Sequence, residues 1–574
     1  MPLFAQTPTL AWQQLYGNST DREYGNASIR LNSNLYVHGG YLWPPSPSIV
    51  NTYAVFTDGN GTFLRDKLFP DLNAGKITGM AANDDGTFVA CGSYQDSVGA
   101  WAVFIFKADQ LGNIQWRRSF TGDMGNSQRV VRVPDGYLII TSNQVRIIKT
   151  DLNGRFIWKK VYGQDCGGES ITPLPDGSYL ATGWSTRGGA STVSTFYKLS
   201  YWLLKLRPNG DTIYTRIIGT PTNYEVGHAA ANTQDGGVAV AGAYVANVPN
   251  TKRQGQVLKL DSLLNLQWEM KVMPNGGSYS VGCEFFAIQP TVSGDYVVAG
   301  QNFRNTYNEA FMARITPPTT LGGNAGLNWS SYFTGGAFIR EILFENDGSA
   351  MVGGTGYIGP VSSANMQVLA LKLINTDQPY RPDFCATPPQ AYFTTQLRPD
   401  SLILLGGSAS QSGLRYGVIS KWEYQFGDGS RFITYQPSAA KRVAHKYNQP
   451  AQLLFGTAVK LIVTNNLFCT DTLTLYPFGG GPTGISEATA QQVEVKLFSQ
   501  PLQQRATLEL KNYRGKARLQ LEFTDLLGRK VTVLHRQEKP GLWQLEKGNL
   551  SKGLYLYRVV SPSSVVAQGK LVVH

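Results

Sequence analysis

The chain has 574 residues, including 62 Gly, 29 Pro, 29 Tyr and 11 Trp. This length exceeds one ordinary hydrophobic core, and the composition is typical of turn-rich β structure in several domains. No apolar run is long enough to cross a bilayer as a helix, so we expect no transmembrane segment. The formal net charge is +12, but residues 493–574 hold +8 of it, with 14 Lys or Arg against 6 Asp or Glu. Without an Arg-rich run or zinc-finger spacing, this distribution argues against a nucleic-acid partner.

Residues 1–6, MPLFAQ, leave two interpretations open. Leu3, Phe4 and Ala5 before Gln6 match the end of a signal peptide that is cleaved after Ala5, although the charged and long apolar parts are missing. An ordinary disordered N-terminus fits these residues equally well.

Residues 7–380 carry two repeated patterns. One is a seven-residue step from a turn residue to an aromatic residue, as from Asp109 to Trp116 and from Asp151 to Trp158. The other is a Gly-containing turn that leads into an apolar run, as in LPDGSYLATG from Leu174. Because a catalytic site occurs once whereas scaffolding repeats, we predict four-stranded propeller blades whose aromatic strand is outermost.

The last blade ends near Asp377 without an aromatic outer strand, while the chain begins with TLAWQQLYG, which carries Trp12. We predict that this N-terminal strand completes the last blade, closing a ring of seven blades and removing two sheet edges. The pattern resembles secreted seven-bladed propellers of the broad WD-repeat and quinoprotein-like type over residues 7–380. That resemblance concerns architecture and not activity.

The Asp-x-Asn-Gly-x-x-x-Trp pattern is similar to the Asp-box of sialidases, although its two internal spacings are each one residue longer. We interpret it as a structural turn. Only two histidines, His38 and His228, lie in the predicted propeller, which argues against a His-based metal cluster. Its three cysteines fall in different blades and are expected to pack or to be free thiols: Cys91, Cys166 and Cys283. We therefore predict no metal, no cofactor and no assigned catalytic residue.

One position of each blade differs in chemistry from blade to blade. It lies seven residues before the repeated turn position, near the start of the innermost strand: Asn26, Thr78, Gln128, Glu169, His228, Phe286 and Arg340. We expect these side chains at one mouth of the central channel, where propellers usually bind ligands.

Three interpretations of this channel rim remain open. Glu169, His228 and Arg340 have the chemistry to bind an anionic or hydroxyl-rich ligand, or to perform acid–base work if they converge. The third interpretation is a solvated rim without a ligand. Convergence of two carboxylates, or of these three residues, in one deep pocket would favour a hydrolytic enzyme, whereas a shallow polar rim would favour binding.

Residues 385–477 differ in composition and contain the segment KWEYQFGDGSRFITYQ. Trp422 precedes a Gly-Asp-Gly turn at 427–429, and His445 and Tyr447 follow. These residues resemble a PKD domain, an immunoglobulin-like β-sandwich found in secreted proteins. The segment AQLLFGTAVKL departs from the family, which more often has a Gly before a short strand.

Two features of this predicted sandwich stay open. Asp428 is expected to cap backbone amides in its turn, with calcium ligation as the alternative. Cys385 and Cys469 flank the module, and export would permit a disulfide between them, but their separation of 84 positions neither supports nor excludes it.

Residues 478–492 are rich in Gly, Ser, Thr and Pro and are predicted to form a flexible linker. Residues 493–574 resemble the type A sorting domain of the type IX secretion system of certain Gram-negative bacteria. The resemblance departs at FSQP, where Tyr-Pro-Asn-Pro is usual, and is carried by Pro501, Asp525, Gly528, Arg529, Val531, Gly553, Tyr555, Gly569, Lys570 and Leu571. It implies a sorting signal made of Asp525, Gly528, Gly553, Tyr555, Gly569, Lys570 and Leu571.

The sequence thus predicts an all-β chain with a seven-bladed propeller, an immunoglobulin-like sandwich and a small C-terminal β-sandwich. The resemblances imply export through the periplasm to the outer-membrane surface or the medium, with the secretion translocon and a sortase as partners and anionic lipopolysaccharide attached after tail cleavage. The predicted function is binding or adhesion to an unidentified extracellular glycan or protein. The alternative is an extracellular carbohydrate-active or other hydrolytic enzyme with its site at the channel mouth.

Overall fold

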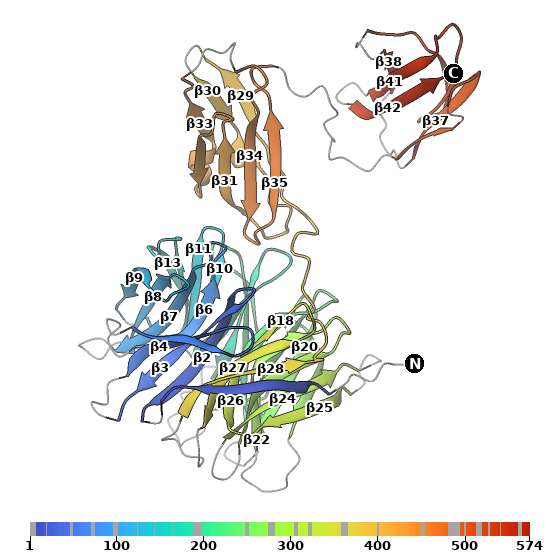
Figure 1. Ribbon diagram of the computed structural model, residues 1–574. Coiled ribbons are helices and arrows are strands. Elements are labelled where there is room, and N and C mark those ends of the chain that lie inside the picture. The colour runs from blue at the N-terminus through green and yellow to red at the C-terminus, as the bar shows by residue number, and fades with distance from the viewer. Residues whose placement is uncertain are drawn as a thin grey trace. The chain divides into compact units, whose positions relative to one another are not determined.

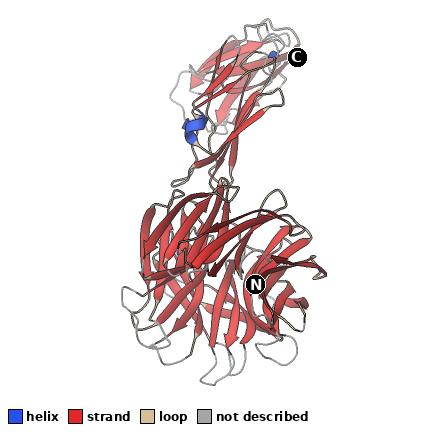
Figure 2. Ribbon diagram, turned by 90° about the vertical axis from the view of Figure 1, so that its left-hand side faces the viewer, coloured by secondary structure: helices blue, strands red, loops and turns tan. Residues whose placement is uncertain are grey.

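The computed structural model describes residues 7–574 except for gaps at 19, 46–49, 70–74, 96–100, 123, 143, 164, 187–197, 247–251, 274–281, 304–307, 319–323, 358–365, 399–400, 449–453, 480–493, 499–500, 512–518, 526–528, 540 and 561–564. Residues 1–6, most of the predicted linker and Gly528 therefore lie outside the described residues. The described part of the chain is all-β apart from two short helical turns, η1 (Gly407–Ala409) and α1 (Pro437–Ala440) (Figure 2). Within these ranges no helix has the length and apolar character needed to cross a membrane.

The first part of the chain forms seven four-stranded antiparallel sheets in succession (Figure 1). Their strands are β2–β5 (Arg22–Asn32, Leu35–Trp43, Asn51–Thr57, Phe63–Phe69), β6–β9 (Lys76–Ala82, Phe88–Gln95, Trp101–Ala108, Ile114–Phe120), β10–β13 (Asn126–Val133, Gly136–Ser142, Val145–Thr150, Phe156–Gly163), β14–β17 (Cys166–Pro173, Tyr179–Ser185, Ser200–Leu206, Thr212–Ile218), β18–β21 (Tyr224–Asn232, Val238–Val245, Gln254–Leu260, Leu266–Val272), β22–β25 (Gly282–Pro290, Tyr296–Phe303, Asn308–Thr316, Gly326–Phe333), and β26–β28 (Gly336–Phe344, Ala350–Tyr357, Met366–Ile374) with β1 (Thr9–Tyr16).

The sheets close into a ring, which is the arrangement of a β-propeller. Each innermost strand contacts the innermost strand of the next sheet, and β26 contacts β2 to complete the circle. The middle strands are buried along their length, as in β11, β12 and β16, because neighbouring sheets cover both of their faces. The outer strands alternate between exposed and partly buried residues, as in β9.

The N-terminal strand completes the last blade, as predicted. β1 pairs antiparallel with β28, from Thr9 opposite Ile374 to Tyr16 opposite Val368. The hydroxyl of buried Tyr16 donates a hydrogen bond of 2.7 Å to the carbonyl of Gly61 in the first blade. The N-terminal strand β1 is therefore held to the last blade by its pairing with β28 and to the first blade by the Tyr16 hydrogen bond.

The repeated Asp turn is a structural element, and its Asp caps the backbone. In the Asp151 turn, Oδ1 accepts hydrogen bonds of 2.8 Å from the amides of Asn153 and Arg155. The tryptophan of one blade then packs on the turn glycine of the next blade: a Cβ on Gly210 would lie 2.8 Å from the Trp158 ring. The pattern thus links adjacent blades.

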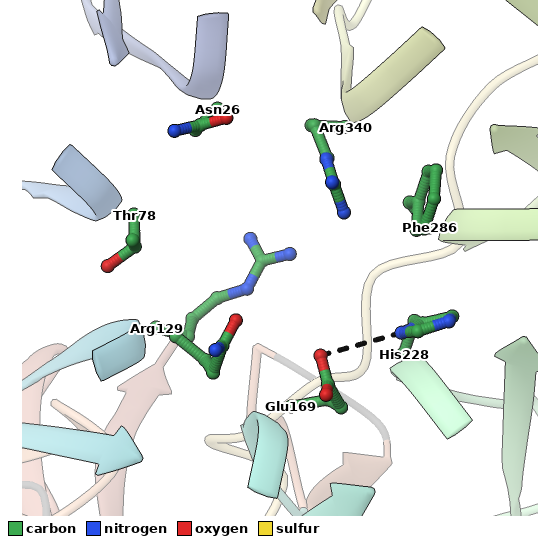
Figure 3. A pocket seen from close by; sticks show the side chains of 8 residues that line it. Asn26, Thr78, Arg129, Glu169, His228, Phe286 and Arg340 are labelled. Carbon is green, nitrogen blue, oxygen red and sulfur yellow. Dashed lines mark hydrogen bonds and ion pairs between the residues drawn. The ribbon is translucent and has the colours of Figure 1, made fainter. Parts of the chain in front are cut away.

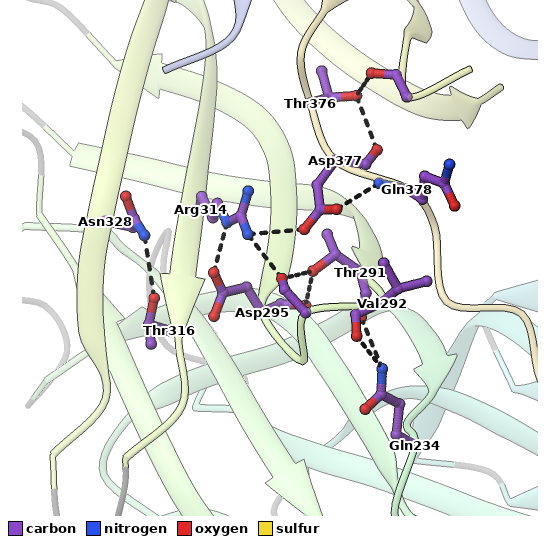
Figure 4. A network of polar contacts seen from close by, with 12 residues as sticks. Gln234, Thr291, Val292, Asp295, Arg314, Thr316, Asn328, Thr376, Asp377 and Gln378 are labelled. Carbon is purple, nitrogen blue, oxygen red and sulfur yellow. Dashed lines mark hydrogen bonds and ion pairs between the residues drawn. The ribbon is translucent and has the colours of Figure 1, made fainter. Parts of the chain in front are cut away.

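A polar network fixes the chain where it leaves the last blade (Figure 4). The buried Arg314 of β24 donates from Nε to Asp295 at 2.6 Å and from Nη2 to Asp377 at 3.0 Å. The amide of Gln378 donates to the other carboxylate oxygen of Asp377 at 2.7 Å. Arg314 therefore ties the segment after β28 to the preceding blade.

The next segment is a two-sheet sandwich. Its sheets pair β29 (Thr394–Leu397), β30 (Leu402–Leu405) and β33 (Arg442–His445), and β32 (Arg431–Thr434), β31 (Ile419–Gln425), β34 (Val459–Asn465) and β35 (Thr470–Leu475). The buried Trp422 donates from Nε1 to the carbonyl of Gly407 at 2.8 Å. A disulfide joins Cys385 to Cys469, which answers the question that their spacing left open.

Asp428 has the turn role expected for it. Its Oδ1 accepts a hydrogen bond of 2.9 Å from the amide of Ser430, and its Oδ2 lies 2.7 Å from Nε2 of His445. The His445 ring stacks on Phe426 with centroids 4.0 Å apart, and Tyr447 donates to the Phe426 carbonyl at 2.8 Å. The Gly-Asp-Gly turn and the His-x-Tyr pair thus brace each other.

The sandwich contacts the turn between β14 and β15 of the propeller. The amide of Tyr416 donates to the Asp176 carbonyl at 2.9 Å, and Asn466 Nδ2 donates to the Gly177 carbonyl at 2.8 Å. Both contacts lie in the one turn that follows β14, the inner strand that carries the rim position Glu169.

The C-terminal segment is a second compact unit with two sheets of its own. Leu508, Trp543, Leu545, Val559 and Leu571 are buried in its core. One sheet has the strand order β36 (Glu494–Phe498), β37 (Arg505–Lys511), β40 (Leu542–Glu546) and β39 (Leu534–Lys539). The other has the order β38 (Gln520–Thr524), β41 (Gly553–Val560) and β42 (Val565–Val573).

Candidate functional site

The candidate site is built from one irregularity that recurs in every blade. In each sheet the register between the innermost strand and the second strand skips one residue, which is a β-bulge. Leu31 and Ala337 are second skips in two of these sheets. One skipped residue in each sheet is a rim position predicted from the sequence: Asn26, Thr78, Gln128, Glu169, His228, Phe286 and Arg340. A bulged residue has no partner across the ladder, so its side chain is turned away from the regular alternation of the strand.

Glycines make room for these bulges. In six blades the second-strand residue opposite the bulge is a glycine, and an added Cβ would overlap a carbonyl oxygen of the inner strand: Gly40, Gly92, Gly183, Gly242, Gly300 and Gly354. The blade with Gln128 has Thr141 instead. The close approach of the two backbones at the bulge therefore explains why the repeated sequence pattern ends in glycine.

The seven bulge residues and Arg129 line one pocket, with a cavity volume of about 220 Å³. Figure 3 shows Arg129 and Arg340 directed into the middle of the pocket, with Glu169 and His228 on one wall and Asn26 and Thr78 on another. The structure thus brings together every rim residue expected from the sequence. Whether they bind a ligand stays a prediction.

His228 is held between two carboxylates. Its Nε2 lies 2.7 Å from Oε1 of the buried Glu284, and its Nδ1 lies 3.5 Å from Oε2 of Glu169. Burial disfavours the charged imidazole, but the bonds to both carboxylates outweigh it and raise the pKa of His228 to about 9. His228 is therefore protonated at neutral pH and donates from both ring nitrogens.

Glu284 is the buried anchor of this arrangement. Burial would raise the pKa of Glu284, but the bonds to His228 and Arg253 reverse that effect and hold it at about 2. Its Oε2 accepts hydrogen bonds from Arg253 Nη1 at 2.7 Å and from Gln301 Nε2 at 3.2 Å. The carboxylate is thus ionised at every physiological pH.

Arg340 differs from the other charged groups at the site. Its guanidinium lies over the Phe286 ring, 3.9 Å from the centroid, and 5.1 Å from the Phe338 centroid. Among the described residues, none accepts a hydrogen bond from it and no carboxylate forms an ion pair with it. The two rings hold Arg340 in place while its donors face the pocket.

Three residues of the site were not expected from the sequence: Arg129, Glu284 and Arg253. Arg129 follows the bulge residue Gln128 and forms an ion pair with Glu341, whose pKa is raised by burial although Arg129 opposes the rise. Glu284 and Arg253 lie outside the bulge positions. No repeated spacing in the sequence marks any of the three.

The neutral polar side chains are fixed by scaffold bonds. Asn26 Nδ2 donates to the Ile77 carbonyl at 2.9 Å, and Gln128 Nε2 donates to the Ser142 hydroxyl at 3.1 Å. Each amide keeps its carbonyl oxygen and a second N–H for other partners. The Thr78 hydroxyl lies 2.9 Å from the Ser127 hydroxyl.

The geometry can be compared with the two chemistries considered for the rim. Glu169, His228 and Arg340 do converge, which is one criterion for a hydrolase. However, Glu169 is the one carboxylate among the described lining residues, whereas glycoside hydrolysis uses a pair. The protonated His228 also lacks a lone pair with which to act as a general base. The described lining thus provides one carboxylate and a protonated imidazole that can donate hydrogen bonds to a ligand.

The predicted sorting residues lie in the C-terminal unit. Asp525 caps the amide of Arg529 at 2.9 Å and pairs with its Nε at 2.7 Å, while Gly528 lies outside the described residues. The other five lie on the paired strands β41 and β42, where Tyr555 is opposite Leu571: Gly553, Tyr555, Gly569, Lys570 and Leu571. Their role in sorting stays a prediction.

No known family model matches the chain, and no curated protein matches it in sequence. Among solved structures, YCF48 from Cyanidioschyzon merolae is 13% identical with a TM-score of 0.38, and the match covers 63% of this chain and 99% of that one. A structure of YCF48 bound to D1 peptide is 13% identical with a TM-score of 0.38, and the match covers 65% of this chain and 99% of that one. A protein of unknown function from Dyadobacter fermentans is 10% identical with a TM-score of 0.37, and the match covers 64% of this chain and 99% of that one. At these values the similarities carry no argument about function, and the propeller assignment rests on the strand pairing.

Proposed function

We propose that this chain is an exported binding protein whose propeller holds a small anionic or hydroxyl-rich ligand at one end of its channel. The observation that carries the proposal is the convergence of the seven bulge residues on one polar pocket, in which Arg340 forms no hydrogen bond or ion pair with a described residue. Six of those seven side chains are polar, and a cavity lined this way favours a ligand that forms hydrogen bonds over an apolar one.

The test is a binding screen of the full chain against a glycan array and a panel of small metabolites and proteins. Arg340→Gln should weaken binding of an anionic hit, and Glu169→Ala binding of a hydroxyl-rich hit, by about 10-fold or more, because each variant removes a charged hydrogen-bond partner. Arg155→Gln, on an exposed turn outside the pocket, serves as the control. Thermal unfolding should change little in all three variants. If both pocket variants bind every hit like the parent protein, the propeller pocket is not the binding site.

A hydrolytic enzyme is the second candidate, favoured by the shared pocket of Glu169 and His228. Release of a chromogenic leaving group from a panel of aryl glycosides and esters would support it if Glu169→Gln abolished the release. We rank it second because the pocket lining provides a single carboxylate.

We also propose how the chain is exported. On the sequence resemblances described above, residues 385–477 are a PKD domain and residues 493–574 are a type IX sorting domain. The Cys385–Cys469 disulfide supports a route through an oxidising compartment. The compact fold of the C-terminal unit supports a separable address tag. On this proposal the translocon reads the tail, a sortase removes it, and the mature chain is released or joined to anionic lipopolysaccharide.

The export proposal is tested in a host that has type IX secretion. Deleting residues 493–574 should retain a folded propeller and sandwich in the periplasm, and grafting those residues onto an inert exported protein should send it across the outer membrane. Immunoblots of periplasm, surface and medium measure both effects. Normal surface delivery of the truncated chain would overturn the assignment.

A further inference from the structure

The charges around the pocket cancel except for one. Arg129 pairs with Glu341. Separately, Glu169 and Glu284 face His228, and Arg253 adds a second cation, so this group carries two positive and two negative charges.

Arg340 is the charge left over. Among the described lining residues and their ion-pair partners it is the one cation that forms no ion pair, although Glu284 and Glu169 attract it at longer range, and the summed charge of these groups is +1. A monoanionic ligand would neutralise the site. A dianion would bring an excess negative charge close to Glu169 and Glu284, where low solvent exposure leaves repulsion poorly screened.

The shape of the anionic group also follows from the donors. A guanidinium presents parallel N–H groups in a planar fork that matches the two oxygens of a carboxylate. Stacking on Phe286 fixes the plane of this fork and lowers the entropy lost on binding. Arg129 approaches from the other side of the pocket (Figure 3), so an anion between the two guanidinium groups would be contacted from two directions.

The rest of the lining is suited to hydroxyl groups. The free oxygens of Asn26 and Gln128 accept hydrogen bonds and their spare N–H groups donate them. Glu169 has carboxylate lone pairs left after its contact with His228. The cavity volume of about 220 Å³ is below the ~300–1,000 Å³ typical of pockets for drug-sized ligands, so it favours a small ligand.

We propose that the pocket binds a small polyhydroxylated monocarboxylate, with its carboxylate on Arg340 and its hydroxyls on the amide side chains and Glu169. This inference rests on the proposed binding function and adds the chemical class of the ligand. Such a carboxylate belongs either to a free sugar acid or to the terminal residue of a glycan, and both present the same groups to the pocket.

The experiment is isothermal titration of the full chain at pH 7.5 with D-glucuronate, D-glucose, acetate and D-glucose 6-phosphate. Glucuronate should bind at least about 10-fold more tightly than glucose, which lacks the charge, and than acetate, which lacks the hydroxyls. It should also bind more tightly than the phosphate ester, which is mainly a dianion at this pH. Methyl β-D-glucuronide separates the sources: retained binding indicates a glycan end, and lost binding indicates the free acid.

Two variants test the assignment of groups. Arg340→Gln should reduce glucuronate affinity by about 10-fold or more, while Arg155→Gln leaves it unchanged. Glu169→Gln raises the net charge of the pocket to +2, so the phosphate ester should gain affinity relative to glucuronate. The second variant adds no bulk and retains an acceptor for His228, so it keeps the test informative if Arg340→Gln fails to fold.

The outcomes separate this inference from the function on which it rests. Equal binding of glucose and glucuronate, tighter binding of the phosphate ester by the parent protein, or no heat with any probe would overturn the carboxylate assignment. The binding function would survive these results if another ligand from the screen bound in a manner sensitive to Arg340→Gln. It would fail together with the inference if no ligand did.

Discussion

At the seam between the first and last blades, one buried hydroxyl bonds to two backbone groups. Thr355 of β27 is fully buried, and its Oγ1 accepts a hydrogen bond of 3.0 Å from the Gly25 amide while donating one of 3.3 Å to the Gly25 carbonyl. Thr355→Val keeps the shape of the side chain and removes both bonds. Two buried backbone groups then lose a partner at a cost of about 1–3 kcal/mol each, so we expect about 2–6 kcal/mol of destabilisation.

The effect on melting temperature follows from the size of the propeller. Unfolding entropy is about 2.1 cal/mol/K per residue, which for about 370 residues gives ~0.8 kcal/mol/K, so a loss of ~3 kcal/mol lowers Tm by about 4 °C. Thr355→Ser is the matched control: it keeps the hydroxyl and loses one methyl group, worth about 0.8 kcal/mol and about 1 °C.

Differential scanning calorimetry of the full chain measures both shifts, and amide hydrogen exchange of β2 identifies the propeller transition. If Thr355→Val melts at or above the temperature of Thr355→Ser, the two hydrogen bonds do not stabilise the seam. The reasoning about ring closure through Gly25 would then be wrong.

Three further predictions concern the closing strand, the pocket and the turn that contacts the sandwich. Tyr16→Phe removes the buried bond to Gly61 and should cost about 1 kcal/mol in chemical denaturation, with an unchanged midpoint as the contrary result. The pKa of His228 is raised to about 9, above its unfolded value of ~6.5, so the stabilisation by its protonated form is complete below pH 6.5 and is lost as pH rises through 9. Between these two pH values the free energy of unfolding should fall by up to about 1.4 kcal/mol per pH unit. His228→Gln should flatten this slope. Gly177 has φ 85°, and an added Cβ would lie 2.6 Å from the sandwich backbone, so Gly177→Ala should destabilise the protein by more than about 1–2 kcal/mol and speed proteolysis between the domains. Gly236→Ala is the control, because Gly236 has φ 79° and open space around it, so the substitution should cost only the backbone strain.

The architecture of the propeller was readable from the sequence because its causes are local and repeated. Turn glycines, capping Asp residues and outer tryptophans recur once per blade, and each has a local role that composition and spacing reveal. The missing outer strand of the last blade and the unpaired strand around Trp12 were both visible, so β1 was assigned correctly. The disulfide was not predictable, since the spacing of Cys385 and Cys469 says nothing about their distance in space.

The pocket was only partly readable. Counting back from each turn found the bulge residues, since register from turn to bulge is the same in each blade. Arg129 was missed because a regular strand would turn the residue after Gln128 away from the channel. Glu284 was missed because its contact with His228 joins two blades 56 residues apart, and no periodicity encodes such a pair.

The bulge also explains how one scaffold can carry a pocket that has no sequence motif. Ladder positions on either side of each bulge are apolar or small except for Arg129 and Glu341, which form an ion pair, and the opposite position is glycine in six blades. The bulge residue itself has no ladder partner and faces the channel, so its identity is free of both constraints. Seven such positions yield a ring in which an arginine, a histidine, a glutamate, two amides, a hydroxyl and an aromatic ring stand side by side. On the proposed binding function, a change of ligand would require changes at these seven positions, which lie outside the ladder pairing of the blades.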